Sequence, residues 1–196
     1  MTDHHEYLTY LLKRSWFGKL YRRFYLYQTL RRYMGQTVLD VGCDIGNISD
    51  FYQHAHGIDI NPFDVEICKL RGFSVYVKHL DTLHFVHRIY DTITLDNELE
   101  PIEDPEPLLS EGKRVLCDNG SMIVAVPGIK VYASDLDYKH NYGEVALINR
   151  MEINGLKLEN LLYLPFKKSN FLSKIVRQYF IYGVFKKNLS FGGWSV

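Results

Sequence analysis

The spacing of apolar residues along the chain changes near residue 36. Over residues 6–34 apolar side chains recur at every fourth position, which predicts a helix, interrupted near 15–18, with one apolar face. Beyond residue 36 the chain contains short apolar runs bounded by glycine or proline, a pattern typical of strands buried on both faces of a parallel sheet. These runs predict strands over residues 37–42, 56–60, 73–77, 92–95 and 121–126.

Helical segments are expected between these strands. We predict helices over residues 46–53, 62–69, 105–116 and 143–151, and two late strands over 156–164 and 178–186. The third helix is followed by Asp118-Asn119-Gly120, which we expect to form a turn. Strands that alternate with helices at this spacing indicate an α/β fold, namely a Rossmann-like, doubly wound sheet of seven mostly parallel strands with an N-terminal helical extension.

The length and composition suit a single domain. The chain has 196 residues, 46% of them hydrophobic and 23% charged, which excludes a largely disordered protein. We expect residues 1–36 to form the helical extension and residues 37–196 the rest of the domain. The three cysteines form no disulfide framework, and the longest apolar run, 179–185, is far shorter than the ~20 residues that span a bilayer. The polar start contains no secretion signal, so we expect a reduced, cytoplasmic protein.

A glycine-containing turn follows the first predicted strand. In a doubly wound sheet, ligands bind beyond the carboxyl ends of the strands, where Gly42 and Gly46 would let a ligand approach backbone N–H groups. Asp59 stands 17 positions after Gly42, at the end of the second strand, where a carboxylate can accept both hydroxyls of a ribose. The nicotinamide fingerprint GxGxxG is not matched, because the two glycines are four apart and position 44 is Asp.

This turn resembles the first motif of the class I S-adenosylmethionine-dependent methyltransferases, an acid-x-Gly-x-Gly-x-Gly sequence. Residues 80–85, 90–105 and 113–121 are similar to later motifs of the same family, in the same order. The resemblance covers residues 37–127, and it implies the methyltransferase fold with S-adenosylmethionine as the cofactor. The eight histidines show no metal-binding spacing, so we expect no metal.

The resemblance also implies which residues hold the cofactor. Asp59 would bind the ribose hydroxyls, Asp81 would accept from the adenine amino group, and Asp96 would lie near the sulfonium. The full set that it implies is Asp40, Gly42, Cys43, Asp44, Gly46, Asp59, Ile60, Asp81, Thr82 and Asp96. The alternative for each aspartate and glycine is ordinary capping or turn chemistry.

Two positions depart from the family pattern. Asp44 stands in place of the middle glycine, where it would either pair with the ammonium group of the cofactor or weaken binding. Pro101 replaces a histidine that many relatives carry after the Leu-Glu pair. These departures keep open a second hypothesis, in which the chain is a non-catalytic binding or scaffold protein with the methyltransferase fold.

The resemblance implies transfer of a methyl group to a small-molecule or glycan acceptor. Such a transfer depends mainly on positioning, and a base is needed only for an acceptor such as a hydroxyl. His140, in the loop after the fifth strand, is the candidate base. The alternative is that Asp135 and Asp137 in the same loop only cap the following turn.

The formal net charge of zero is a sum of unequal parts. Residues 1–36 carry +5, residues 37–166 carry −11 and residues 167–196 carry +6. The two basic ends are rich in aromatic residues. They would form one surface for an anionic or lipid-linked acceptor, with peripheral membrane contact. The alternative is an ordinary solvated helix face that pairs with the acidic middle of the chain. The charge excludes a uniformly basic nucleic-acid binder, and no Asn/Asp-Pro-Pro-Tyr motif is present, so a nucleic-acid methyltransferase is the least favoured alternative.

Overall fold

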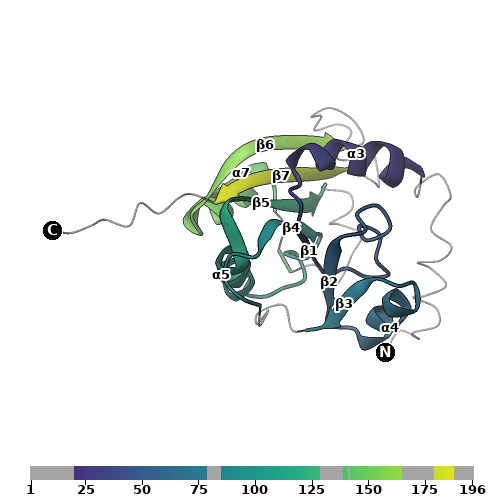
Figure 1. The fold of residues 1–196 in the computed structure, drawn as a ribbon. Helices are drawn as coiled ribbons and strands as arrows, with labels where there is room; N and C mark the ends of the chain where they lie inside the picture. Colours follow the sequence, from purple (N-terminus) through teal and green to yellow (C-terminus); the bar gives the residue numbers. More distant parts are fainter. Residues whose placement is uncertain (1–19, 79–84, 129–138, 141, 165–178, 188–196) are drawn as a thin grey trace.

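The computed structural model describes residues 20–78, 85–128, 139–140, 142–164 and 179–187, and it contains one seven-stranded sheet. The strand order is β3-β2-β1-β4-β5-β7-β6 (Figure 1). The strands are β1 (Val38–Val41), β2 (Ala55–Asp59), β3 (Ser74–Val77), β4 (Tyr90–Asp96), β5 (Leu116–Pro127), β6 (Leu156–Leu164) and β7 (Phe180–Lys187). The first five strands run parallel, and β7 lies antiparallel between β5 and β6. The predicted Rossmann-like, mostly parallel sheet is therefore confirmed.

Helices connect and cover the strands. They are α4 (Pro62–Leu70), α5 (Glu106–Val115) and α7 (Glu144–Ile153), together with a helical stretch before β1 made of η1 (Arg22–Leu26), α3 (Tyr27–Leu30) and η2 (Arg31–Tyr33). This stretch agrees with the C-terminal part of the expected extension. The remainder of that extension lies outside the described residues, so the boundary at residue 36 stays a prediction.

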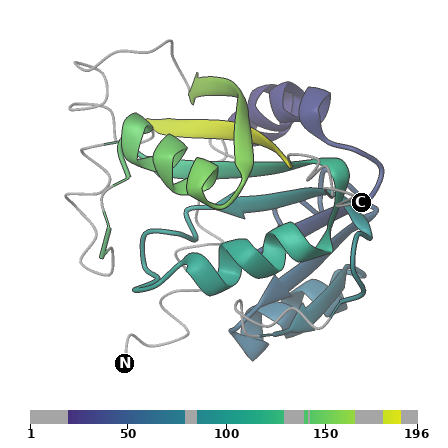
Figure 2. The ribbon, with the colours of Figure 1, turned by 90° about the vertical axis from the view of Figure 1, so that its left-hand side faces the viewer.

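The central strands β1, β4 and β5 are largely buried on both faces, which is why they are rich in apolar residues. Alternate residues of β5 enter different cores: Met122 and Val124 pack with α5 and α7, whereas Ile123 and Ala125 pack with Leu26 and neighbouring residues of the helical stretch before β1. Figure 2 shows α5 and α7 on one side of the sheet and that helical stretch on the other.

The sheet topology brings three strand ends together. In the strand register Val41 pairs with Ile58 on one side and with Leu95 on the other. The residues that follow these three are Gly42, Asp59 and Asp96, so they meet at one edge of the sheet. Because β1 lies between β2 and β4, this edge is the switch point at which doubly wound sheets bind ligands.

Two local predictions are wrong. Residues 46–53 form a series of turns rather than a helix, because Gly46 takes a positive φ of 80° to close the turn after β1. The expected turn at 118–120 is instead a bulge within β5: pairing with β4 shifts between Tyr90 and Thr92, and Asn119, not Gly120, has a positive φ of 63°. Asparagine tolerates this conformation better than most residues.

The packing of β7 gives a testable prediction. A Cβ atom on Gly183 would overlap the ring of the fully buried Phe185, so Gly183→Ala should lower the free energy of unfolding by about 1–3 kcal/mol. The expected fall in Tm, measured by thermal denaturation, is roughly 2–4 °C per kcal/mol.

Gly143→Ser is the matched control. A Cβ atom on Gly143 meets nothing within 4 Å, and serine is favoured at the residue preceding α7, so stability should stay constant or rise slightly. A Gly183→Ala variant as stable as the wild type would contradict the packing described for β7.

Candidate cofactor site

The turn after β1 is built on left-handed backbone conformations. Gly42, Asp44 and Gly46 have φ values of 70°, 47° and 80°. The N–H groups of Gly42 and Cys43 both donate to the carbonyl of Ile58, at 2.9 and 3.0 Å, which fastens the turn to β2. Aspartate is one of the few residues that adopt positive φ without severe strain. Asp44 therefore takes a backbone conformation that glycine would also favour.

Asp59 joins this turn to the start of α4. Its carboxylate accepts hydrogen bonds from the backbone N–H of Asp44 at 3.0 Å and of Asn61 at 2.8 Å. The side chain is buried, and desolvation raises its pKa despite these bonds. Each carboxylate oxygen has a second lone pair, so Asp59 can accept two further donors. The neighbouring Ile60 is 60% exposed and offers an apolar surface beside the carboxylate.

Two further predicted carboxylates lie at this edge. Asp40 is buried in β1 and accepts a hydrogen bond from Thr94 Oγ1 at 2.7 Å. Desolvation raises the pKa of Asp40 well above its ordinary value, and nearby carboxylates add to the shift. Asp96, at the end of β4, pairs with the Arg22 guanidinium at 3.1 Å and accepts from the Tyr182 hydroxyl at 3.3 Å. Arg22 thereby connects the helical stretch before β1 to the site.

Sequence reasoning missed Glu98. A Cβ atom on Gly42 would overlap the carboxyl group of Glu98, so this side chain lies directly over the turn. Desolvation raises the pKa of Glu98 well above its ordinary value, and the nearby carboxylates of Asp44, Asp59, Asp40 and Asp96 raise it further. The run of acidic residues after β4 was the available signal, but the sequence alone does not indicate which of them turns back over the glycines.

A cavity of about 50 Å³ remains at the centre of this arrangement. Ligand pockets usually measure ~300–1,000 Å³, so a whole cofactor requires the side chain of Glu98 to move from above Gly42. Asn97 Oδ1 is buried and has no hydrogen-bond partner among the described residues, which leaves an acceptor for a ligand donor. The lining residues are Arg22, Tyr27, Asp40, Gly42, Cys43, Asp44, Asn47, Ile48, Asp96 and Asn97.

These observations fit S-adenosylmethionine. A glycine at position 42 leaves room for close approach to the backbone, and the carboxylates suit a ligand that carries sulfonium and ammonium charges. Within the described residues, no group of three or more His, Cys, Asp or Glu side chains is arranged to hold a metal ion. No helix in that part of the chain is long and apolar enough to span a membrane.

Of the remaining predicted site residues, only His140 belongs to the part of the chain that the structure describes. Asp81 and Thr82 lie outside the described residues, so their contact with adenine stays a prediction. His140 lies beside the segment after β4: its N–H donates to the carbonyl of Glu100 at 3.2 Å, and Nε2 is 2.8 Å from the carbonyl of Glu103. A carbonyl can only accept, so Nε2 carries the proton and Nδ1 is left as an acceptor.

Glu100 is a second carboxyl that the sequence did not single out. The side chain is fully buried, and neither carboxyl oxygen makes a hydrogen bond within the described part of the chain. Burial raises the pKa of Glu100 to about 8, so the group is mostly protonated at pH 7. Its backbone carbonyl also accepts from Lys139 at 2.8 Å, which joins the segment after β4 to residues 139–140.

Comparison with known proteins identifies the domain. Residues 39–124, from β1 into β5, match the family model described as a methyltransferase domain. An uncharacterized protein of Methanocaldococcus jannaschii is 27% identical over 88 residues. That match covers 45% of this chain and 43% of the relative, so the chain spans less than half the length of this curated relative.

Solved structures share the fold over a greater length. An S-adenosylmethionine-dependent methyltransferase of Thermotoga maritima, described as a possible histamine N-methyltransferase, superposes with a TM-score of 0.74 at 18% identity, covering 93% of this chain and 97% of that one. Geranyl diphosphate C-methyltransferase of Streptomyces coelicolor, solved with Mg²⁺, geranyl diphosphate and S-adenosyl-L-homocysteine, has a TM-score of 0.65 at 13% identity, covering 82% and 76%. Residues 39–124 thus match a methyltransferase domain, and the chain has the fold of the S-adenosylmethionine-dependent methyltransferases.

Proposed function

We propose that the chain binds S-adenosylmethionine at the carboxyl ends of β1, β2 and β4 and catalyses methyl transfer to a small-molecule acceptor. The observation that carries this proposal is the pair of hydrogen bonds by which Asp59 holds the turn after β1 and the start of α4. They fix a carboxylate at the switch point with acceptor capacity to spare for two ribose hydroxyls.

Different residues of the site would bind different parts of the cofactor. Asp59 would accept from the ribose hydroxyls, Ile60 would pack against adenine, and Asp81 with Thr82 would recognise its amino group. The turn 42–46, with Asp40, Cys43 and Asp44, would hold the methionine part. Asp96, Asn97 and Glu98 would face its positive charges.

The cofactor, when bound, supplies an electrophilic methyl group on a sulfonium. The chain's own contribution is to position the acceptor and exclude water, since an in-line displacement gains most from correct orientation. Arg22 supports this role because its pairing with Asp96 holds the helical stretch over the site. For a hydroxyl acceptor we propose His140 as the base, through the unprotonated Nδ1.

The carboxyl groups around Gly42 favour a neutral or cationic acceptor. An anionic acceptor would find no positively charged partner among these carboxyl groups, although the basic ends of the sequence favour one. The Thermotoga relative, named as a possible histamine N-methyltransferase, supports a small acceptor by analogy of fold. We therefore place a small molecule ahead of a glycan, and both ahead of a nucleic acid.

A second candidate function rests on the position of Glu98. A side chain over Gly42 and a cavity of about 50 Å³ also suit a non-catalytic protein that keeps the fold without binding the cofactor. Titration calorimetry with S-adenosylmethionine and S-adenosylhomocysteine separates the two candidates. No heat of binding at millimolar ligand would favour the non-catalytic protein and overturn the enzyme.

The role of Asp59 gives the first prediction for this site. Asp59→Ala removes charge-assisted hydrogen bonds to the ribose and to the turn, so the affinity for S-adenosylhomocysteine should fall by about 10-fold or more. Asp118→Ala is the control, because Asp118 pairs with Arg88 at the start of β5, at the opposite edge of the sheet. Its affinity should stay within about 2-fold of the wild type. Equal affinities for the Asp59 variant and the wild type would refute the ribose assignment.

The clustered carboxyl groups give the second prediction. Asp40 and Glu98 have raised pKa values in the free protein, so binding of a cationic ligand should lower these pKa values and release protons. Titration calorimetry in phosphate and in Tris measures this release, because the two buffers differ in ionisation enthalpy. S-adenosylhomocysteine has no sulfonium and should release fewer protons than S-adenosylmethionine.

Glu98→Gln removes one of the titrating groups and should reduce the number of protons released. Asp118→Asn, at the other edge of the sheet, should leave it unchanged. Identical binding enthalpies for the wild type in both buffers would contradict the assigned charge state of the site.

A further inference from the structure

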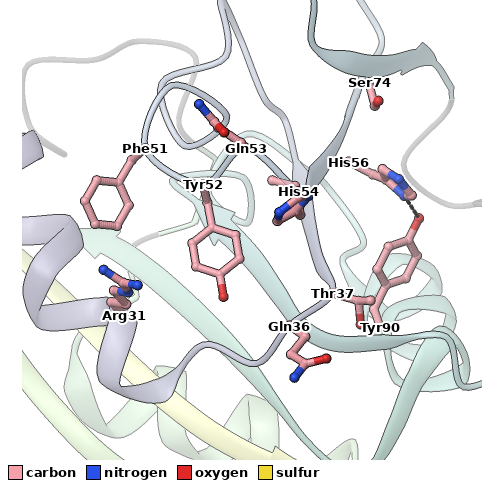
Figure 3. Close-up of a pocket in the computed structure, with 11 residues that line it drawn as sticks. Arg31, Gln36, Thr37, Phe51, Tyr52, Gln53, His54, His56, Ser74 and Tyr90 are labelled. Atoms are coloured by element: carbon pink, nitrogen blue, oxygen red, sulfur yellow. Dashed lines mark hydrogen bonds between the residues drawn. The ribbon is translucent and has the colours of Figure 1, made fainter.

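A second cavity lies at the amino-end edge of the sheet, opposite the cofactor site. Its volume is about 880 Å³, within the range of small-molecule pockets. It opens where β1, β2, β3 and β4 begin: Thr37 directly precedes β1, His56 and Ser74 lie at the starts of β2 and β3, and Tyr90 is the first residue of β4. Figure 3 shows side chains from the helical stretch, from the turns before β2 and from these strand starts around the space.

The polar groups of this cavity suit an anion. Arg31 contributes a guanidinium, His54 and His56 contribute imidazoles, and Gln36 and Gln53 contribute amide donors. Among the residues that the structure describes, no aspartate or glutamate lines the cavity. A guanidinium with several neutral donors and no competing carboxylate is the arrangement that binds a phosphate group.

The Asp91 carboxylate, which is hydrogen-bonded to two lining residues of this cavity, is already engaged. Asp91 Oδ2 accepts from the backbone N–H groups of Gln36 and Thr37 and from Thr37 Oγ1, each at 3.0 Å. These bonds lower the pKa of Asp91 and hold the segment before β1 in place. Asp91 thus serves as a structural anchor for the cavity wall.

Aromatic side chains form further parts of the wall, and several of them are held in position. Phe51 packs against Tyr27 with ring centroids 5.4 Å apart, and the Tyr52 hydroxyl donates to the carbonyl of Gly35. The Tyr90 hydroxyl lies 2.9 Å from His56 Nδ1. Rings fixed in this way offer flat surfaces for a planar ligand at little cost in conformational entropy.

A neighbouring cavity of about 510 Å³ lacks this charge pattern. Arg32 and Lys186 line it, but Asp91, Asp118 and Glu159 line it as well. Lys186 lies 3.9 Å from Glu159, so much of the positive charge there is already balanced. Of these two cavities, the one beside Arg31 is therefore the better anion site.

We propose that the cavity lined by Arg31, His54 and Phe51 binds a nucleoside monophosphate, with the phosphate on the guanidinium side and the base against the aromatic wall. This site is separate from the cofactor site and goes beyond methyl transfer. It does not depend on the proposed function, because its residues lie at the other edge of the sheet.

Titration calorimetry with 5′-AMP tests the proposal on the full chain. The protein is first saturated with S-adenosylhomocysteine, so that the adenosine part of AMP cannot occupy the cofactor site. We expect a dissociation constant below about 1 mM, weakened about 10-fold or more by Arg31→Ala. Arg32→Ala is the matched control, since it removes a cation at the next position in the chain that does not line this cavity.

Each outcome decides the question. Adenosine and inorganic phosphate, titrated separately, should both bind more weakly than AMP. No binding of AMP at 1 mM, equal binding of adenosine, or equal losses in the Arg31 and Arg32 variants would overturn the proposal. The affinity for S-adenosylhomocysteine, measured on each variant, should match the wild type and shows that Arg31→Ala still folds. If the wild type fails to bind that ligand, the proposed function fails, while the comparison of AMP between the two arginine variants still tests this cavity.

Discussion

The two hydrogen bonds that backbone N–H groups donate to the Asp59 carboxylate hold the candidate cofactor site together. They join the turn after β1, which takes three left-handed conformations, to the first residues of α4. Without an acceptor at this position, the N–H of Asp44 would be left unpaired at a buried edge of the sheet, at a cost of ~1–3 kcal/mol. The same carboxylate that would recognise the ribose therefore also maintains the shape of the glycine turn.

Several carboxyl groups lie close together at the candidate cofactor site, and their mutual repulsion is unfavourable in the ligand-free protein. Glu98 and the aspartates near it raise one another's cost of ionisation, and Arg22 supplies a compensating charge at Asp96. A ligand with two positive charges would relieve this repulsion. The relief would contribute part of the free energy of binding. These carboxyl groups contribute part of the formal charge of −11 that residues 37–166 carry.

Sequence patterns predicted the sheet well because its central strands, β1, β4 and β5, are largely buried on both faces and rich in apolar residues. Asp59 was singled out by its place at the end of a predicted strand and Asp96 by the family resemblance, and the structure places both at one edge of the sheet. The turns at 46–53 were predicted as a helix because parallel strands are usually connected by one, whereas the positive φ of Gly46 is set by tertiary closure. The position of Glu98 over Gly42 and the pairing of Arg22 with Asp96, 74 positions apart, depend on three-dimensional packing that no local pattern encodes.

The docking of the helical stretch before β1 has a consequence for the order in which the protein folds. Leu26 and Leu30 pack with Leu164 of β6 and Val184 of β7, two strands that are synthesised long after the helical stretch. Arg22 therefore cannot be held over Asp96 by this packing until β6 and β7 have been synthesised. Contacts between such distant segments form late and slowly, so the cofactor site should be among the last parts of the domain to be completed.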